Sequence, residues 1–214
     1  MEEYLKAISV MNDLILSKVI TPSEIIDFSR TDIRWANQKK KKKNWNSKVI
    51  KKGQIYQFDF GKNYIPEMSY EHRGMIIGVK GKLLYVLPIF SYLQKYQKDV
   101  YDCVANSTGN LFFLSSVKYP FLKRDSLLKL NDIRTVSIDR ILYFQDNGFD
   151  IKSELYKTII RLVFEKYFPD ISYQFKNMEE ENENQKNEIE KLQIKLVNLE
   201  NEVMLLKERK EKNE

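Results

Sequence analysis

Apolar residues recur every three or four positions over residues 2–19, a spacing that predicts an amphipathic helix. A second helix start follows at the run Thr21-Pro22-Ser23-Glu24. Its first and last residues have the spacing of a capping box, and its proline suits the first helical turn. We expect this second helix to run to about Trp35 and to form a hairpin with the first that packs on the rest of the chain.

From Gly53 onward the pattern changes to short β-prone runs in which apolar and polar residues partly alternate. The sequence predicts strands at 55–60, 75–79 and 83–90, a hairpin formed by 100–105 and 111–116, and a short strand at 134–136. Five or six short strands joined by tight turns favour a small closed or half-closed barrel. With helices on either side, the expected fold class is α+β.

The C-terminal part has a helical pattern at 151–168, ended by Pro169, and then a heptad repeat. The apolar a and d positions of this repeat are Ile189, Leu192, Leu196, Leu199, Val203 and Leu206. The flanking pairs Lys195–Glu200 and Glu202–Lys207 are opposite in charge, which suits two parallel helices in register. We therefore expect a self-associating coiled coil, with a single helix folded back on the body as the alternative.

These patterns divide the chain into four segments. They are a helical hairpin at 1–37, a basic linker at 38–50, a strand-rich domain with a closing helix at 51–169, and a coiled coil at 170–214. We expect the chain to form a homodimer through the strand-rich domain and the coiled coil.

The charge is unevenly distributed along the chain. Residues 176–214 hold 8 basic and 11 acidic side chains, whereas residues 1–175 hold 28 and 19, a net of +9. A basic body favours a polyanionic partner, most often nucleic acid. The five lysines Lys39, Lys40, Lys41, Lys42 and Lys43 with Trp45 suit an arm that contacts phosphates and stacks on a base. A solvated linker without a specific role explains the same run equally well.

Several kinds of chemistry lack their residues in this sequence. One cysteine excludes an intramolecular disulfide, and one histidine with one cysteine cannot form the usual soft metal set, so we expect no metal and no cofactor. Cys103, in a mostly apolar run, is expected in the core. The 7 glycines form no phosphate-binding loop. No apolar stretch has the length of a membrane span and no secretory signal is visible, so we expect no membrane association and a cytoplasmic protein.

The candidate chemistry lies around the second predicted strand. Glu67, Glu71, His72 and Arg73 surround the start of this strand, and the third strand ends at Ser91. An arginine fork and a hydroxyl can hold a phosphate, while a nearby glutamate or histidine can transfer a proton. On the residue types alone, an arginine after a polar loop is more often an ion-paired surface residue.

The order of short motifs over about residues 51–145 resembles the PemK/MazF family of toxins from type II toxin–antitoxin systems. The motifs are Gly53-Gln54-Ile55-Tyr56 with Asp59-Phe60, the loop to Glu67, Arg73, Leu87-Pro88-Ile89-Phe90-Ser91, Lys123-Arg124-Asp125-Ser126-Leu127-Leu128, and Asn131-Asp132-Ile133-Arg134-Thr135-Val136 followed by Asp139-Arg140-Ile141. Two positions differ from the family pattern, because Gly74 stands where the family usually has proline and Ser91 where threonine is more common.

The resemblance implies a small SH3-like β-barrel of the CcdB/PemK-like kind that dimerises and cleaves single-stranded RNA without a metal. Arg73 and Ser91 would then be catalytic, with attack of the ribose 2′-hydroxyl on the adjacent phosphate. The loop from Lys62 through Tyr64 to His72 would cover the RNA. A small acidic antitoxin protein would bind across the same groove with a segment that is disordered when free.

Two other hypotheses remain open at the level of the sequence. One is a non-catalytic nucleic-acid-binding or regulatory protein on the same barrel, using the lysine run and the basic body. The other is a scaffold whose working part is the coiled coil.

Overall fold

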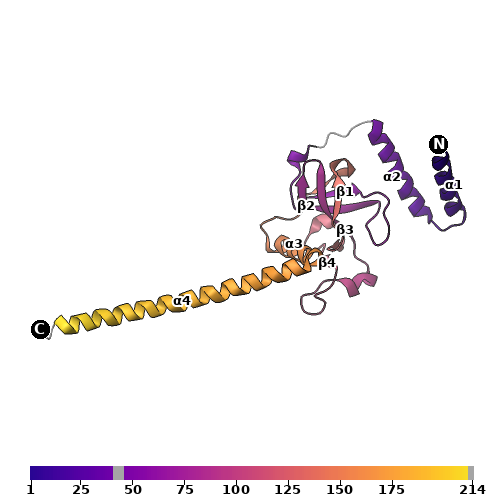
Figure 1. The fold of residues 1–214 in the computed structure, drawn as a ribbon. Helices are drawn as coiled ribbons and strands as arrows, with labels where there is room; N and C mark the ends of the chain where they lie inside the picture. The colour runs from indigo at the N-terminus through magenta and orange to yellow at the C-terminus, as the bar shows by residue number, and fades with distance from the viewer. Residues whose placement is uncertain (41–45, 212–214) are drawn as a thin grey trace. The chain divides into compact units, whose positions relative to one another are not determined.

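The computed structural model describes residues 1–40 and 46–211, apart from the side chains of residue 202 and residues 205–211. The chain divides into two compact units, Met1–Val163 and Phe164–Glu214. The first unit contains an antiparallel sheet and helices at its N-terminal side (Figure 1). The second consists of the end of helix α3 (Glu154–Tyr167) and the long helix α4 (Pro169–Glu211).

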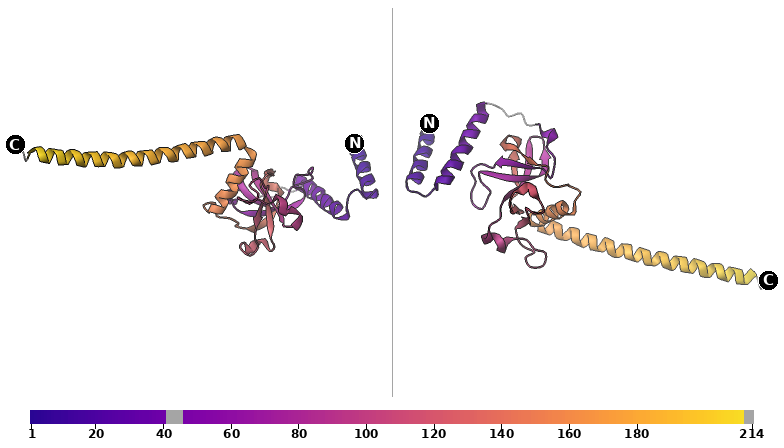
Figure 2. Two further views of the ribbon diagram at one scale, coloured as in Figure 1. Left: turned by 90° about the horizontal axis from the view of Figure 1, so that it is seen from below. Right: turned by 180° about the vertical axis from the view of Figure 1, so that it is seen from behind.

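The N-terminal residues form the predicted helical hairpin, made of α1 (Glu2–Leu16) and α2 (Pro22–Lys40). The capping box is confirmed, because the Thr21 amide donates to Glu24 Oε2 at 2.9 Å and the Glu24 amide donates to Thr21 Oγ1 at 3.3 Å. Helix α2 runs to Lys40 rather than ending near Trp35. It lies beside the sheet, with α1 on its outer side (Figures 1 and 2). Within the hairpin, only Thr31 is fully buried.

Seven strands form one antiparallel sheet in the order β4-β5-β3-β2-β1-β7, with β6 paired to β3. Strand β3 is hydrogen-bonded to β2 along one edge, and to β6 and then β5 along the other. The sheet is not closed. The strands are β1 (Ile55–Asp59), β2 (Glu71–Lys80), β3 (Leu83–Ser91), β4 (Leu111–Leu114), β5 (Ser126–Lys129), β6 (Arg134–Ser137) and β7 (Ile141–Asp146).

Four short 3₁₀ helices connect these elements among the described residues. They are η1 (Ser47–Val49), η2 (Gln94–Asp99), η3 (Pro120–Leu122) and η4 (Ile138–Arg140). η3 matters for the site because it leads directly into β5.

The two faces of the sheet carry separate cores, because side chains alternate along each strand. One core joins Ile55, Met75 and Leu87 to the α3 residues Ile159 and Leu162. The other core lies on the opposite face and contains Tyr56, Phe58, Ile76, Leu84, Val86 and Ile141. The mixed α+β class is therefore confirmed, with the α3 helix predicted at 151–168 covering one face.

The hairpin predicted from residues 100–105 and 111–116 is wrong. Residues 111–114 do form β4, but β4 pairs with β5, and the earlier segment makes only the isolated bridges Val100–Leu111 and Asp102–Asn106. The Asp102 carboxylate accepts from the amides of Val104 and Ala105 at 2.8 and 2.7 Å, a local turn that replaces strand geometry. The same turn exposes Cys103, so its expected place in the core is also wrong.

Helix α4 is a single helix of 43 residues. Neither it nor any other helix in the described part of the chain combines the length and the apolar character needed to cross a bilayer.

Candidate functional site

An open cleft of about 370 Å³ lies where β1, β2 and β3 meet the loop between η3 and β5. It brings together four residues singled out in the sequence, Glu71, His72, Arg73 and Ser91. Its full lining is Gln57, Glu71, His72, Arg73, Ile89, Phe90, Ser91, Leu122, Lys123, Arg124 and Gln145.

Strand alternation explains why polar side chains gather here. Arg73 is paired in register with Gln57 of β1 and Ile89 of β3. Two residues away along β2, Met75 lies in the core on the same face. The face that carries this core therefore becomes polar toward one end of the sheet, where Glu71 and Ser91 continue the same alternation.

Two protein acceptors hold the Arg73 guanidinium in place. Nη1 donates to the Leu122 carbonyl at 2.9 Å, and Nη2 donates to Ser126 Oγ at 3.0 Å. Ser126 is fully buried and donates in turn to the Arg124 carbonyl at 2.9 Å. Burial, and then the nearby charge of Arg124, lower the pKa of Arg73, but arginine stays cationic in proteins. A fixed positive fork therefore lies at the base of the cleft.

A tight turn presents two more cations beside this fork. Lys123 has φ 59° and ψ −25°, which is uncommon for a residue with a side chain. The Arg124 amide donates across it to the Leu122 carbonyl at 2.7 Å, so one carbonyl serves both the turn and Arg73. Strain of this kind persists only where surrounding contacts enforce it, and such positions cluster at functional sites.

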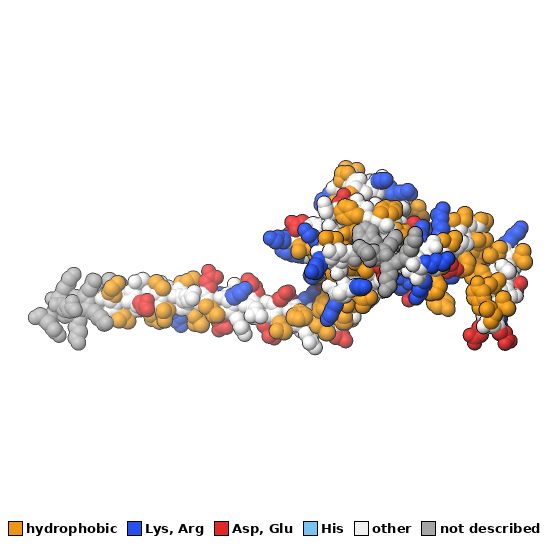
Figure 3. Space-filling model, turned by 90° about the horizontal axis from the view of Figure 1, so that it is seen from above, with side chains coloured by type: hydrophobic (Ala, Val, Ile, Leu, Met, Phe, Trp, Pro, Cys, Tyr) orange, Lys and Arg blue, Asp and Glu red, His pale blue; other side chains and the backbone are white. Residues whose placement is uncertain are grey.

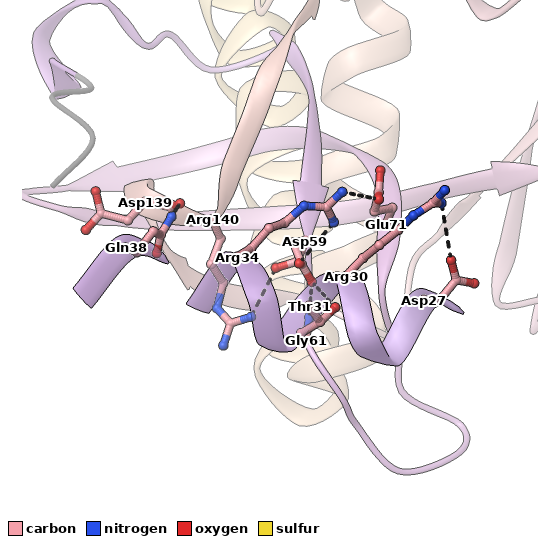
Figure 4. A network of polar contacts seen from close by, with 10 residues as sticks. All are labelled: Asp27, Arg30, Thr31, Arg34, Gln38, Asp59, Gly61, Glu71, Asp139 and Arg140. Carbon is pink, nitrogen blue, oxygen red and sulfur yellow. Dashed lines mark hydrogen bonds and ion pairs between the residues drawn. The ribbon is translucent and has the colours of Figure 1, made fainter. Parts of the chain in front are cut away.

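The one carboxylate of the cleft, Glu71, is ion-paired with Arg34 of α2 (Figure 4). Arg34 also contacts Asp59, at 3.2 Å. Burial alone would lower the pKa of Arg34, but its bonds to Glu71 and Asp59 raise it. The N-terminal hairpin thus neutralises Glu71 and leaves the cleft dominated by positive charge.

The Asp59 carboxylate is the centre of the contact between α2 and the sheet. Asp59 as a residue is 5% exposed, and its carboxylate accepts from Thr31 Oγ1 at 2.9 Å and from the Gly61 amide at 3.0 Å, in addition to Arg34. Arg140 donates to the Asp59 backbone carbonyl at 3.0 Å (Figure 4). A buried carboxylate with this many donors is well compensated.

His72 borders the cleft, but strand alternation places its side chain on the face opposite Arg73. Its register partner is Phe58, a member of the second core. Burial lowers the pKa of His72, while Asp27 of α2 acts in the opposite direction. His72 therefore borders the cleft, while its side chain belongs to the face opposite that of Arg73 and Ser91.

A pH prediction follows from the lowered pKa of His72, the one histidine of the chain. Below the ordinary value of 6.5 the unfolded chain binds a proton more readily than the folded chain, so the free energy of unfolding falls as the pH decreases from about 7 to 5.5. An NMR titration of the single imidazole is expected to give a midpoint below 6.5. A His72→Gln variant should lose less stability over the same range, and a midpoint at or above 6.5 would contradict the assignment.

Ion pairs and hydrogen bonds hold the loop between β1 and β2 against residues that do not line the cleft. Glu67 pairs with Arg134 at 3.1 Å, and the Met68 amide donates to Asp132 at 2.8 Å. Lys62 pairs with Asp32 of α2 at 2.8 Å. Tyr64, 89% exposed, lies free of the core at the loop surface. Of the loop residues predicted to meet RNA, none lines the cleft except those at the start of β2.

The lysine run begins within α2. Lys39 and Lys40 form its last turn, and the Lys39 ammonium lies 5.2 Å from the centre of the Trp35 ring. Lys41, Lys42, Lys43 and Trp45 lie outside the described residues.

No role in the site is predicted from the sequence for Lys123, Arg124, Ser126 or Arg34, although the first three lie in a motif of the resemblance. Lys123 and Arg124 form an adjacent basic pair, a signal that could have marked them. Ser126 and Arg34 act through contacts distant in the sequence, which the residues around them do not indicate.

Gly74, where the resemblance would place proline, is fixed by packing. A Cβ at this position would lie 2.3 Å from Val86 Cγ1 and 3.1 Å from the Phe58 ring. The close approach of these side chains from β1 and β3 explains the glycine beside Arg73.

Neither a scan against protein-family models nor a search of curated proteins finds a match for this chain. In residues 1–40 and 46–211, no group of three or more His, Cys, Asp and Glu side chains is placed to hold a metal ion.

Proposed function

We propose that this protein is an endoribonuclease of the PemK/MazF type that cleaves single-stranded RNA without a metal, as the toxin of a type II toxin–antitoxin system. The observation that carries the proposal is the composition of the cleft. Arg73, Lys123 and Arg124 lie together beside the hydroxyl-bearing Ser91, and the one carboxylate is neutralised by Arg34. Such a site favours a phosphodiester over a neutral or cationic ligand.

The proposed reaction uses the RNA's own nucleophile. The ribose 2′-oxygen attacks the adjacent phosphorus and loses its proton, the bond from phosphorus to the 5′-oxygen breaks, and that oxygen gains a proton. The products are a 2′,3′-cyclic phosphate and a free 5′-hydroxyl. Arg73 stabilises the added negative charge in the transition state, and Ser91 donates to a non-bridging oxygen. Such a reaction depends more on positioning than on a strong base.

Proton transfer in this scheme falls to Glu71 rather than His72. Glu71 lines the cleft on the same face as Arg73, whereas the imidazole belongs to the opposite face. Its pairing with Arg34 holds the carboxylate in a fixed position. Glu67, paired with Arg134, has no part in the reaction.

The wider proposal includes a half-closed SH3-like barrel as the fold of the antiparallel sheet in the first unit. The antitoxin is a small acidic protein that occupies the same cleft, because carboxylates compete with phosphates for the same cations. Lys39 and Lys40 supply further positive charge for the RNA backbone.

A second function is favoured by the way in which Arg73 is held. Two of its N–H donors are already committed to Leu122 and Ser126, so the arginine also braces the loop that carries Lys123 and Arg124. A cleft with this design can bind an RNA backbone without cleaving it. The second candidate is thus a non-catalytic nucleic-acid-binding protein.

The purified full-length protein, incubated in EDTA with a fluorescent single-stranded RNA of mixed sequence, tests both functions. For an endoribonuclease, we expect cleavage into fragments with cyclic phosphate and 5′-hydroxyl ends. The matching DNA should not be cleaved, because it lacks the 2′-hydroxyl. Binding that weakens steeply with salt but gives no cleavage would instead support the second function. If the protein neither bound nor cleaved RNA, both would be rejected.

A further inference from the structure

The apolar seam of α4 is longer than its clearest heptads. The alternating spacing of four and three residues runs without a break from Ile171 to Leu206. It passes through Phe175, Met178, Asn182 and Gln185 before reaching Ile189. Two of its eleven positions are therefore polar and adjacent, and the rest are apolar.

Beyond Phe175, whose ring centre lies 6.0 Å from that of Phe164, the seam lies open along the described part of α4. Its apolar members from Ile189 to Val203 are each 50–58% exposed, and Met178 is 55% exposed. Figure 3 shows apolar side chains spaced along this helix among charged ones. A helix of 43 residues, about 65 Å long, gains most of its stability from burying such a stripe.

We propose that the seam of α4 is covered by α4 of a second copy of this chain, in a parallel, in-register coiled coil. This inference does not depend on the proposed function. The flanking charges support a parallel pair, because Glu181–Lys186, Lys195–Glu200 and Glu202–Lys207 are all opposite in sign across its two helices.

The two polar positions fix the register. In a parallel pair, Asn182 meets Asn182 of the partner subunit and Gln185 meets the partner's Gln185, so every apolar layer meets an apolar layer. An asparagine at an a position favours a two-stranded arrangement, since its amide pairs with its own copy.

An antiparallel pair would lose part of the seam. In an antiparallel pair, Asn182 can face the partner's Gln185 only if the two helices are shifted along each other. Leu199 then lies opposite a residue that precedes Pro169, the first residue of α4. Leu199, Val203 and Leu206 would then have no partner on α4. With the helices fully overlapped, Asn182 would instead face leucine side chains.

Cysteine cross-linking of the full-length chain tests both the partner and the orientation. With the exposed Cys103 replaced by serine, Leu199→Cys places a thiol in the seam and Asn201→Cys places one on the outer side of the helix. We expect rapid, near-complete disulfide dimers for Leu199→Cys under mild oxidation, and at least about tenfold slower cross-linking for Asn201→Cys. Equal rates would overturn the proposed seam.

Sedimentation equilibrium then tests the number of chains. The wild-type protein should have twice its chain mass of 25.6 kDa, and the Leu192→Glu/Leu199→Glu variant should associate at least about tenfold more weakly. A wild-type monomer, a higher oligomer, or a variant that associates as tightly as the wild type would each overturn the proposal. Asn182→Leu is expected to strengthen association while giving mixed oligomers, because it removes the polar layer.

Discussion

The Arg73→Ala variant is expected to lose RNA cleavage by at least about 100-fold, the scale associated with removing one donor that stabilises a developing negative charge. Two N–H groups of the Arg73 guanidinium are bonded to Leu122 and Ser126, and its remaining N–H groups stay available to a phosphate. Arg73→Lys keeps a positive charge without the planar fork, so most of the loss should remain. Single-turnover cleavage of the fluorescent RNA measures both effects.

Two controls separate catalysis from structure. Arg30→Ala removes an exposed arginine on α2 and should leave cleavage unchanged. Because Arg73 also braces the loop, its loss should lower the free energy of unfolding by about 1–2 kcal/mol, a cost that denaturant titration measures separately. A folded Arg73→Ala protein that cleaves as fast as wild type would remove the cleft from consideration.

Variants of Lys123 and Arg124, the two cations of the loop before β5, test RNA binding separately from cleavage. Lys123→Ala and Arg124→Ala leave the bonds of Arg73 to Leu122 and Ser126 in place, because those acceptors are a backbone carbonyl and another side chain. Each should weaken RNA binding and reduce its dependence on salt by about one phosphate contact.

Replacement of Asp59 by alanine is expected to lower the free energy of unfolding by about 3 kcal/mol. The change leaves the buried Thr31 hydroxyl and the Gly61 amide without their acceptor, and leaves Arg34 with Glu71 alone. Urea denaturation followed by circular dichroism gives the difference.

The matched control is Asp32→Ala, which removes a half-exposed carboxylate of α2 paired with Lys62. It should change stability by no more than about 0.5 kcal/mol. If Asp59→Ala cost no more than this control, the network in Figure 4 would not be what holds α2 to the sheet. Limited proteolysis should also cut α2 faster in Asp59→Ala than in Asp32→Ala.

Sequence patterns predicted the elements that depend on interactions between residues close together in the chain. The capping box at Thr21, the helical hairpin, α3 and strands β1 to β3 all follow from spacing within a few residues. Strands β5 and β7 were not predicted. In β5 three consecutive residues are buried, so the alternation of a half-buried strand is absent, and β7 leaves Tyr143 and Phe144 half-exposed at an edge. The turn at Asp102 was missed because its short side chain competed with the expected strand.

The candidate site likewise combines residues that local spacing brings together with residues that only long-range contacts bring together. Glu71 and Arg73 share a face because of their two-residue spacing on one strand, which the sequence displays. Lys123 and Arg124 join them only through the pairing of β3 with β5, and Arg34 only through the packing of α2. Long-range contacts of this kind depend on the whole fold and leave no local pattern.

The pairing of strand β3 along both of its edges also affects how the site moves. Because β3 is bonded along both edges, to β2 on one side and to β5 and β6 on the other, it cannot open without breaking three pairings at once. Local unfolding then starts elsewhere, at the outer strands β4 and β7. Ser91 ends this strand and is paired with Ser126 of β5, so its backbone should keep its place while the edges of the sheet fluctuate.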